Sequence, residues 1–395
     1  MPLPTPFHPR TSELCESLQF KTWAGYFAVS SYQSHHDPEY FAFRNSAGLL
    51  DISPLFKYEI EGPDSAAFLA SVATRDIRSL SVGRVTYACF CDFQGKVIDD
   101  GTVSRIDEQL FRVTTASPTF SWFERQRRGF DVQITDVSDA IASLAIQGPT
   151  SRDALAAAAG DDIRDLRFFG VISASIDGID VQISRTGYTG DLGYEIWLPS
   201  RHALPVWDAL MESGTPFGLQ PAGLDALDVT RIEAGFILQD VDYFSAPRCV
   251  IESRKSSPFE IGLEWTVQLD RDPFVGQAAL QAEKASGSEW QLVGLEISWE
   301  GIEGLYGAWG LPPSLPTHAC REAVPVYSGG RQVGQVTSTT WSPILKKYLA
   351  LATVKTAQSG LGTSLEIEHT VEFARTRVGA TVVERPFFDP ERKRS

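Results

Sequence analysis

Two adjacent aspartates lie in the segment CDFQGKVIDDGTV, residues 91–103. We expect a turn at residues 93–95 followed by a strand, in which Asp99 and Asp100 point to opposite faces. One of the two then faces inward, where a carboxylate without a partner is costly. The pattern leaves two interpretations open: a functional inward aspartate, or a solvated strand end before Gly101.

A single glutamate follows a loop of glycines and tyrosines in SRTGYTGDLGYEIW, residues 184–197. The Glu195 carboxylate presents two coplanar acceptors, which match an amidine-like donor edge such as the 2-amino group and N3–H of a pterin. Tyr188 could pack against such a ring. The alternative is a hairpin whose glutamate pairs with an arginine.

Signatures of metal and nucleotide sites are absent. His35 and His36 are adjacent and so point to different faces of a regular element, and no HExxH or paired CxxC accompanies them. Cys89 and Cys91 share one face of a strand, and we interpret them as small core residues rather than a redox or metal site. No Walker loop or GxGxxG occurs. We therefore expect no metal ion.

The composition is that of a globular chain of two or three domains: 395 residues, 43% hydrophobic and 22% charged. No apolar run is long enough to span a bilayer, and the N-terminal MPLPTPFHPR lacks a signal-peptide core. Five cysteines do not suggest a disulfide framework. We expect a cytoplasmic protein with no membrane partner. A net charge of -15 without a long basic run argues against nucleic acid.

Alternation of apolar residues and turn signals predict the elements that position these groups. The helix beginning at Ser151 has a serine cap and a glycine stop. The last hundred residues are β-type segments with glycine turns, which predict a barrel or sandwich after a boundary near residue 290. Expected strands cover 57–62, 101–106 and 110–116, and expected helices cover 63–73, 151–160 and 221–235.

Several motifs occur in order along nearly the whole chain and resemble the glycine-cleavage T-protein (aminomethyltransferase) family. That family consists of tetrahydrofolate-dependent one-carbon transferases. The motifs are LLDISPLFKYEIEGPDSAAFL, YACFCDFQGKVIDDGTV, LAIQGPTSRDAL, SRTGYTGDLGYEIWLP, PAGLDALDVTRIEAG, SPFEIGLEW, VGQAAL, GQVTSTTWSPILKKYLALA and VVERPFF.

The resemblance implies an α+β fold of three domains in a ring around a central folate channel, with a C-terminal all-β barrel. Residues 1–290 then form the folate-binding region, made of two interleaved α+β subdomains. The second subdomain covers about 51–138, and residues 291–395 form the barrel. The implied cofactor is tetrahydrofolate.

The resemblance also implies roles for particular residues. Glu195 matches the glutamate that binds the pterin head, and Tyr188 lies in the same loop. Asp100 matches the aspartate beside the folate nitrogens that receive the one-carbon unit. Tyr87 and Arg231 match positions that line the folate site.

One departure from the family is the connection between residues 239 and 263, which is longer than usual. Its DxDY motif is similar to that of folate-dependent O-demethylases of methoxylated aromatic acids. We expect Tyr243 to be the acid for a leaving oxygen and Arg248 or Arg254 to hold a substrate carboxylate. Asp100 would stabilise positive charge on the attacking nitrogen. The alternatives are a surface insertion of no consequence and a tyrosine packed only for order.

Two further departures bear on the substrate. Residues 53–56 read SPLF where the family has SHMG, which suits an apolar methyl donor. The charge of -15 disfavours, without excluding, an acidic lipoyl carrier protein as partner. The leading hypothesis is a tetrahydrofolate-dependent methyltransferase that demethylates a small anionic methyl donor. The alternatives are an aminomethyltransferase acting with a lipoyl carrier, and a non-catalytic folate-binding protein.

Overall fold

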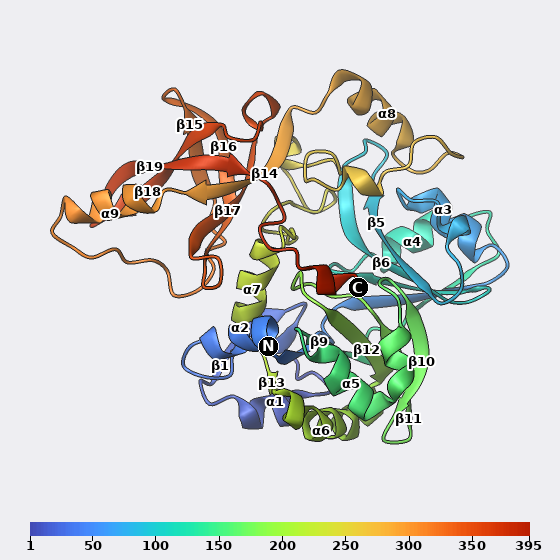
Figure 1. Ribbon diagram of the computed structural model, residues 1–395. Coiled ribbons are helices and arrows are strands. Elements are labelled where there is room, and N and C mark those ends of the chain that lie inside the picture. The colour runs from blue at the N-terminus through green and yellow to red at the C-terminus, as the bar shows by residue number, and fades with distance from the viewer.

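Three β structures organise the chain: a six-stranded sheet, a five-stranded sheet and a closed six-stranded barrel. A computed structural model describes residues 1–395 and shows these structures as three lobes, with the barrel formed by the C-terminal part of the chain (Figure 1). Helices accompany both sheets. The expected α+β fold with a C-terminal β-barrel is confirmed.

The six-stranded sheet has the order β10-β11-β12-β9-β3-β13 and packs helices on both faces. One face buries a core around Trp207 and Ile196 against α5 and α6, and the other packs Trp197 against α2 and α7. A separate hairpin, β1-β2, lies beside α7. The strands are β1 (Gln19–Trp23), β2 (Tyr26–Ser31), β3 (Ala47–Asp51), β9 (Ile141–Gln147), β10 (Val171–Ile176), β11 (Ile179–Ser184), β12 (Gly193–Pro199) and β13 (Leu219–Pro221). The helices are α1 (His8–Leu14), α2 (Asp37–Asn45), α5 (Ser151–Ala159), α6 (Ala203–Gly214) and α7 (Leu224–Glu233).

The expected cap of α5 is wrong in one detail. Thr150 is the N-cap residue and Ser151 is already helical. The Ser151 hydroxyl donates a hydrogen bond to the Leu192 carbonyl oxygen at 3.3 Å instead of capping its own helix. The glycine stop is confirmed, because Gly160 ends the helix with a φ of 94° that favours glycine.

The five-stranded sheet has the order β5-β6-β7-β4-β8 and a core of aromatic residues, among them Phe90 and Phe123. The expected turn between its first two strands is confirmed, since Gly95 has a φ of 73° and donates its N–H to the Asp92 carbonyl oxygen at 3.0 Å. The elements are β4 (Phe56–Glu61), α3 (Ser65–Val72), β5 (Arg84–Cys91), β6 (Val97–Asp107), β7 (Leu110–Thr115), α4 (Phe120–Gln126) and β8 (Gln133–Asp136).

The barrel closes in the order β14-β17-β16-β15-β18-β19, and β16 contacts α7. After β19 the chain returns to the first sheet, where Arg392 donates two hydrogen bonds to Asp191 at 2.7 and 2.8 Å. The elements are α8 (Gln277–Ser286), β14 (Trp290–Ile297), α9 (Trp299–Gly307), β15 (Val324–Ser328), β16 (Arg331–Ser342), β17 (Lys347–Lys355), β18 (Ser364–Val371) and β19 (Ala374–Val383). None of the helices is both long and apolar enough to cross a membrane.

Candidate active site

The antiparallel register of β5 and β6 brings Tyr87 and Asp100 together. Tyr87 lies opposite Thr102 and Cys89 lies opposite Asp100, so the Tyr87 and Asp100 side chains are diagonal neighbours on one face of the sheet. The Tyr87 hydroxyl donates to Oδ2 of Asp100, and the Tyr243 hydroxyl donates to Oδ1. Burial raises the pKa of Asp100, and the hydrogen bonds from Tyr243 and Tyr87 oppose that shift. The carboxylate is thus fixed between two O–H donors.

Asp99 points to the opposite face, as strand alternation predicts. It is fully buried, and its carboxylate accepts the backbone N–H groups of Asp100 at 2.9 Å and Ser117 at 2.8 Å. Burial, followed by the charge of Asp100, raises the pKa of Asp99 well above its usual range. A side chain at Gly101 would place its Cβ 2.0 Å from the Thr114 carbonyl oxygen, so only glycine fits there. The alternative of a solvated strand end is wrong.

The long connection between residues 239 and 263 folds onto the beginning of β6. The Ser245 hydroxyl donates to the Ile98 carbonyl oxygen at 2.6 Å, and the Ala246 N–H donates to the Val97 carbonyl oxygen at 2.9 Å. These bonds hold Tyr243, which is 1% exposed, against the aspartate pair. The connection therefore contributes directly to the Asp100 cluster.

Tyr243 is a hydrogen-bond donor and a very weak acid in this setting. Burial, followed by the charges of Asp100 and Asp99, raises the pKa of Tyr243 well above its usual range. The Tyr243 hydroxyl donates its hydrogen bond to Asp100, so in this structure it orients that carboxylate. Proton donation by Tyr243 to a leaving oxygen stays a prediction.

Arg231 lies in a buried polar network that joins α7, the long connection and the barrel. Its Nε donates to Asp228 at 2.8 Å, its Nη1 to Asp242 at 2.6 Å and its Nη2 to Ser338 at 2.8 Å. The residue is 1% exposed, so the network fixes its position firmly. Direct contact between Arg231 and folate stays a prediction.

Gly187, in the loop between β11 and β12, and Gly193, the first residue of β12, make room for Gln147 of β9. A Cβ at Gly187 would lie 2.0 Å from Oε1 of Gln147, and one at Gly193 would lie 2.1 Å from the same atom. The Gln147 amide donates to the Thr186 carbonyl oxygen at 3.2 Å and its oxygen accepts from the Thr189 hydroxyl at 3.0 Å. The glycines thus let one buried side chain shape the loop.

This loop holds Tyr188 near the Asp100 cluster. The Tyr188 hydroxyl donates to the Ile237 carbonyl oxygen, and its ring stacks on Phe236 with centroids 5.5 Å apart. Burial raises the pKa of Tyr188, the charge of Arg231 opposes the shift and that of Asp100 adds to it. The charges of Arg231 and Asp100 therefore lie near enough to the Tyr188 hydroxyl to affect its pKa.

Glu195 has no cationic partner, so the alternative of a glutamate–arginine hairpin pair is wrong. The residue lies on β12 between Ser184 of β11 and Ala145 of β9. Its Oε2 accepts from the Thr186 hydroxyl at 2.9 Å, and its Oε1 accepts no hydrogen bond. Burial raises the pKa of Glu195 to about 7. The carboxylate keeps acceptor capacity for a ligand that presents N–H groups.

We expect Glu195→Gln to make the protein more stable and to weaken folate binding. The folded-state pKa of Glu195 is raised from 4.5 to about 7, so stability is lost as the pH rises through this window. A glutamine never ionises, so the variant should gain on the order of 2 kcal/mol at pH 8 and little near pH 4.5. Folate affinity should fall about tenfold, because an amide offers one acceptor atom where the carboxylate offers two.

Urea unfolding at both pH values and calorimetric titration with tetrahydrofolate measure the two effects. Glu61→Gln is the matched control, because Glu61 is an exposed residue at the end of β4. Unchanged folate affinity in the Glu195 variant would remove Glu195 from the pterin site.

The two arginines expected to hold a substrate carboxylate lie farther along the long connection. Arg248 is half exposed and donates to the Ser117 hydroxyl at 2.7 Å and to Asp240 at 3.0 Å. Arg254 is exposed and stacks over the Phe244 ring, 4.4 Å from its centroid. Neither forms a hydrogen bond with the Asp100 cluster. Carboxylate binding by either residue stays a prediction.

Residues 53–56 contribute to packing. Leu55 packs against the cluster that contains Tyr40 and Trp197, and Phe56 packs against the core of the five-stranded sheet. Their apolar side chains are thus accounted for by the fold, and an effect on the substrate stays a prediction.

Trp265, the last residue of the SPFEIGLEW motif, joins the cluster although no role was predicted for it. It lies in a short 3₁₀ helix, Glu264–Thr266, and stacks on Tyr87 with centroids 5.9 Å apart and ring planes 13° from parallel. The side chain is 53% exposed. An exposed tryptophan beside a site residue becomes visible only when the tertiary contact is known.

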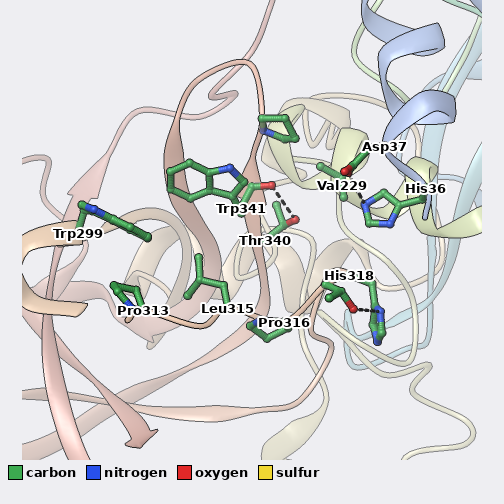
Figure 2. Close-up of a pocket in the computed structure, with 12 residues that line it drawn as sticks. His36, Asp37, Val229, Trp299, Pro313, Leu315, Pro316, His318, Thr340 and Trp341 are labelled. Atoms are coloured by element: carbon green, nitrogen blue, oxygen red, sulfur yellow. Dashed lines mark hydrogen bonds and ion pairs between the residues drawn. The ribbon is translucent and has the colours of Figure 1, made fainter. Parts of the chain in front are cut away.

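A separate cavity of about 340 Å³ lies between α2, α7 and the barrel (Figure 2). The indoles of Trp299 and Trp341 line one end, with centroids 5.2 Å apart, and His36 and His318 line the other. Val229 faces this cavity, and Arg231, two positions along α7, points to a different side of the helix. The cavity is therefore distinct from the Asp100 cluster. No group of three or more His, Cys, Asp or Glu residues in the chain is arranged to hold a metal ion.

The geometry agrees with the comparisons with known proteins. The family model of the GCVT N-terminal domain matches residues 11–271, and that of the glycine cleavage T-protein C-terminal barrel domain matches residues 308–389. The chain belongs to the glycine-cleavage T-protein family. This family is folate-dependent, and the chain is an enzyme of its one-carbon transferase class.

Relatives in the T-protein family match most of the chain. An aminomethyltransferase of Bacillus pumilus is 32% identical over 97% of both chains, and one of Thermotoga petrophila is 34% identical over 89% of this chain and 88% of its own. A trimethylamine-oxide aldolase of Ruegeria pomeroyi is 36% identical over 99% of this chain, which spans 47% of that relative. The crystal structure of aminomethyltransferase T from Bartonella henselae has the same fold, with a TM-score of 0.83, 24% identity and 98% coverage of both chains.

Proposed function

We propose that the chain is a tetrahydrofolate-dependent methyltransferase that moves a methyl group from a small anionic donor to folate N5. The observation that carries the proposal is the fixed Asp100 carboxylate, held by Tyr87 and by Tyr243 from the long 239–263 connection. A carboxylate held on both oxygens presents a preorganised negative charge, which costs no reorganisation when positive charge develops beside it.

The residues present fit a tetrahydrofolate. Glu195 is a buried carboxylate with a free oxygen and no cationic partner, which suits the N–H edge of a pterin. Tyr188, close to Asp100, presents an aromatic body for packing against a flat ring. Bound folate would supply the nucleophilic nitrogen, and the demethylated donor would leave with the proton that this nitrogen gives up on methylation.

The residues of the chain then have separate parts in the reaction. Glu195 binds the pterin head and Asp100 stabilises the positive charge that develops on the attacking nitrogen. Tyr87 and Tyr243 hold Asp100 in position, so the carboxylate does not turn away when the ligand binds. Arg248 or Arg254 binds the carboxylate of an anionic donor.

Methyl transfer is favoured over aminomethyl transfer by two observations. The Tyr243 hydroxyl that completes the Asp100 cluster comes from the long connection, and one relative is named for trimethylamine oxide, a methylated compound. The net charge of -15 also disfavours docking of an acidic carrier. Aminomethyl transfer from a lipoyl carrier is the second candidate, and several relatives named aminomethyltransferase favour it.

Mass spectrometry of the folate product tests the proposal. The protein is incubated with tetrahydrofolate and a panel of methoxy-aromatic, methylthio and methylamino acids. We expect 5-methyltetrahydrofolate from at least one donor, and its rate of formation from that donor should be lower by about a hundredfold or more with Asp100→Asn. Methylenetetrahydrofolate formed only with an aminomethyl-lipoyl carrier would establish the second candidate. No product under any condition would favour a non-catalytic folate-binding protein.

A further inference from the structure

Arg75 is a cation without an anionic partner at the edge of the five-stranded sheet. Its side chain is partly buried, and its Nη1 donates to the Thr86 hydroxyl at 3.0 Å. Its Nε is buried and has no hydrogen-bond partner, and no carboxylate forms an ion pair with the residue. In a chain of net charge -15, an unpaired and partly buried arginine keeps charge and N–H donors that a bound anion would satisfy.

Three contacts, through the side chains of Trp265 and Tyr87, connect Arg75 with Asp100. The Arg75 guanidinium lies over the Trp265 ring, 5.4 Å from its centroid. Trp265 in turn stacks on Tyr87, and Tyr87 donates its hydroxyl to Asp100. Arg75 thus lies at the outer end of an aromatic platform, formed by Trp265 and Tyr87, whose inner end contacts the Asp100 carboxylate.

Arg78, three residues away, is an arginine with a structural role in the same region. Arg78 donates to Asp76 and to Asp272, so its charge is neutralised within the protein. Arg75 has N–H groups without a hydrogen-bond partner, and its planar guanidinium lies over the Trp265 indole. A planar guanidinium with free N–H groups suits the two oxygens of a carboxylate.

We propose that Arg75, on the platform of Trp265 and Tyr87, binds a carboxylate of the ligand that reacts at Asp100. The platform suits a carboxylate carried by a planar aromatic body. Two molecules in the proposed reaction have this chemistry: the benzoyl-glutamate end of tetrahydrofolate and an aromatic-acid methyl donor. The inference rests on the proposed function in placing the reaction at Asp100.

Calorimetric binding to Arg75→Gln tests the inference without requiring turnover. The probes are tetrahydrofolate, 6-methyltetrahydropterin, which lacks the benzoyl-glutamate, 4-methoxybenzoate and its neutral amide. Arg78→Gln is the matched control, because it removes the same charge three residues away. Arg75→Lys keeps the charge without the planar stack and should recover only part of the affinity.

We expect Arg75→Gln to weaken one carboxylate-bearing probe about tenfold or more, with its uncharged or truncated counterpart unaffected. Loss for tetrahydrofolate alone assigns Arg75 to the folate tail. Loss for 4-methoxybenzoate alone assigns the donor's carboxylate to Arg75 in place of Arg248 and Arg254. Affinities within twofold of the wild type for both carboxylate probes would overturn the inference. A failed donor panel with weakened tetrahydrofolate binding would reject methyl transfer and leave Arg75 as a folate-tail residue.

Discussion

Asp100→Asn should lower the turnover by about a hundredfold or more and change the tetrahydrofolate affinity by no more than a few fold. The asparagine keeps the size of the side chain. Its amide oxygen can accept from one of the two tyrosine hydroxyls and its amide N–H can donate to the other, so the cluster should remain assembled. What it removes is the negative charge beside the attacking nitrogen. The loss therefore falls on the step in which charge develops rather than on binding.

The pH dependence of the reaction gives a second measure of the same charge. Burial raises the pKa of Asp100 above its ordinary value of 3.8, so the acid limb of the kcat/KM profile should lie above that pH. The variant should lose this limb. Asp107→Asn is the matched control at the exposed end of the same strand and should retain full activity. Turnover of Asp100→Asn within twofold of the wild type would reject the proposed role.

Arg231→Met should destabilise the fold by about 3–5 kcal/mol, since it leaves buried carboxylates without their cation. Asp242 and Asp228 both bind the Arg231 guanidinium, and both are buried. Asp228 keeps Arg321 as a second partner, so the larger part of the loss should come from Asp242. The urea unfolding midpoint measures the change.

The deficit of this variant should be largest near neutral pH. The charges of Arg231 and Arg321 lower the pKa of Asp228 against the effect of burial, so its contribution is present above pH 3.8 and lost as the pH falls. Asp242→Asn in the Arg231→Met background should restore part of the stability, because it removes the uncompensated charge. Arg248→Met is the control and should shift stability by no more than about 0.5 kcal/mol, since its ion pair is exposed. A comparable loss in both arginine variants would contradict this account.

The local sequence pattern predicted the hairpin that carries the aspartates and their division between opposite faces. Both depend on residues close in sequence, namely a glycine that adopts a positive φ in the turn and the two-residue period of a strand. The order of motifs along the chain predicted the family and the C-terminal barrel, and both are confirmed. The N-cap residue of the helix at Ser151 was predicted wrongly, because a cap depends on a single hydrogen bond.

The contacts that complete the candidate site were decided by the tertiary structure. Tyr243 and Asp100 are 143 residues apart, and their meeting depends on how Ser245 and Ala246 anchor the long connection on β6. The stack of Trp265 on Tyr87 depends on the path of another connection. Local patterns do not encode such paths, because the free energy of a loop position comes from the distant groups that it contacts.

The sequence also did not predict which charged side chains have a partner of opposite charge. From the pattern alone, Glu195 could have an arginine partner or remain a free carboxylate, and only the packed structure shows that no cation reaches it. The same holds for Arg75, whose lack of a partner distinguishes it from Arg78 three residues away. Residue types and spacing determined which chemistry was available to the chain. Burial and distant neighbours decided which of those groups keep charge and bonding capacity for a ligand, because desolvation and pairing are properties of the folded state.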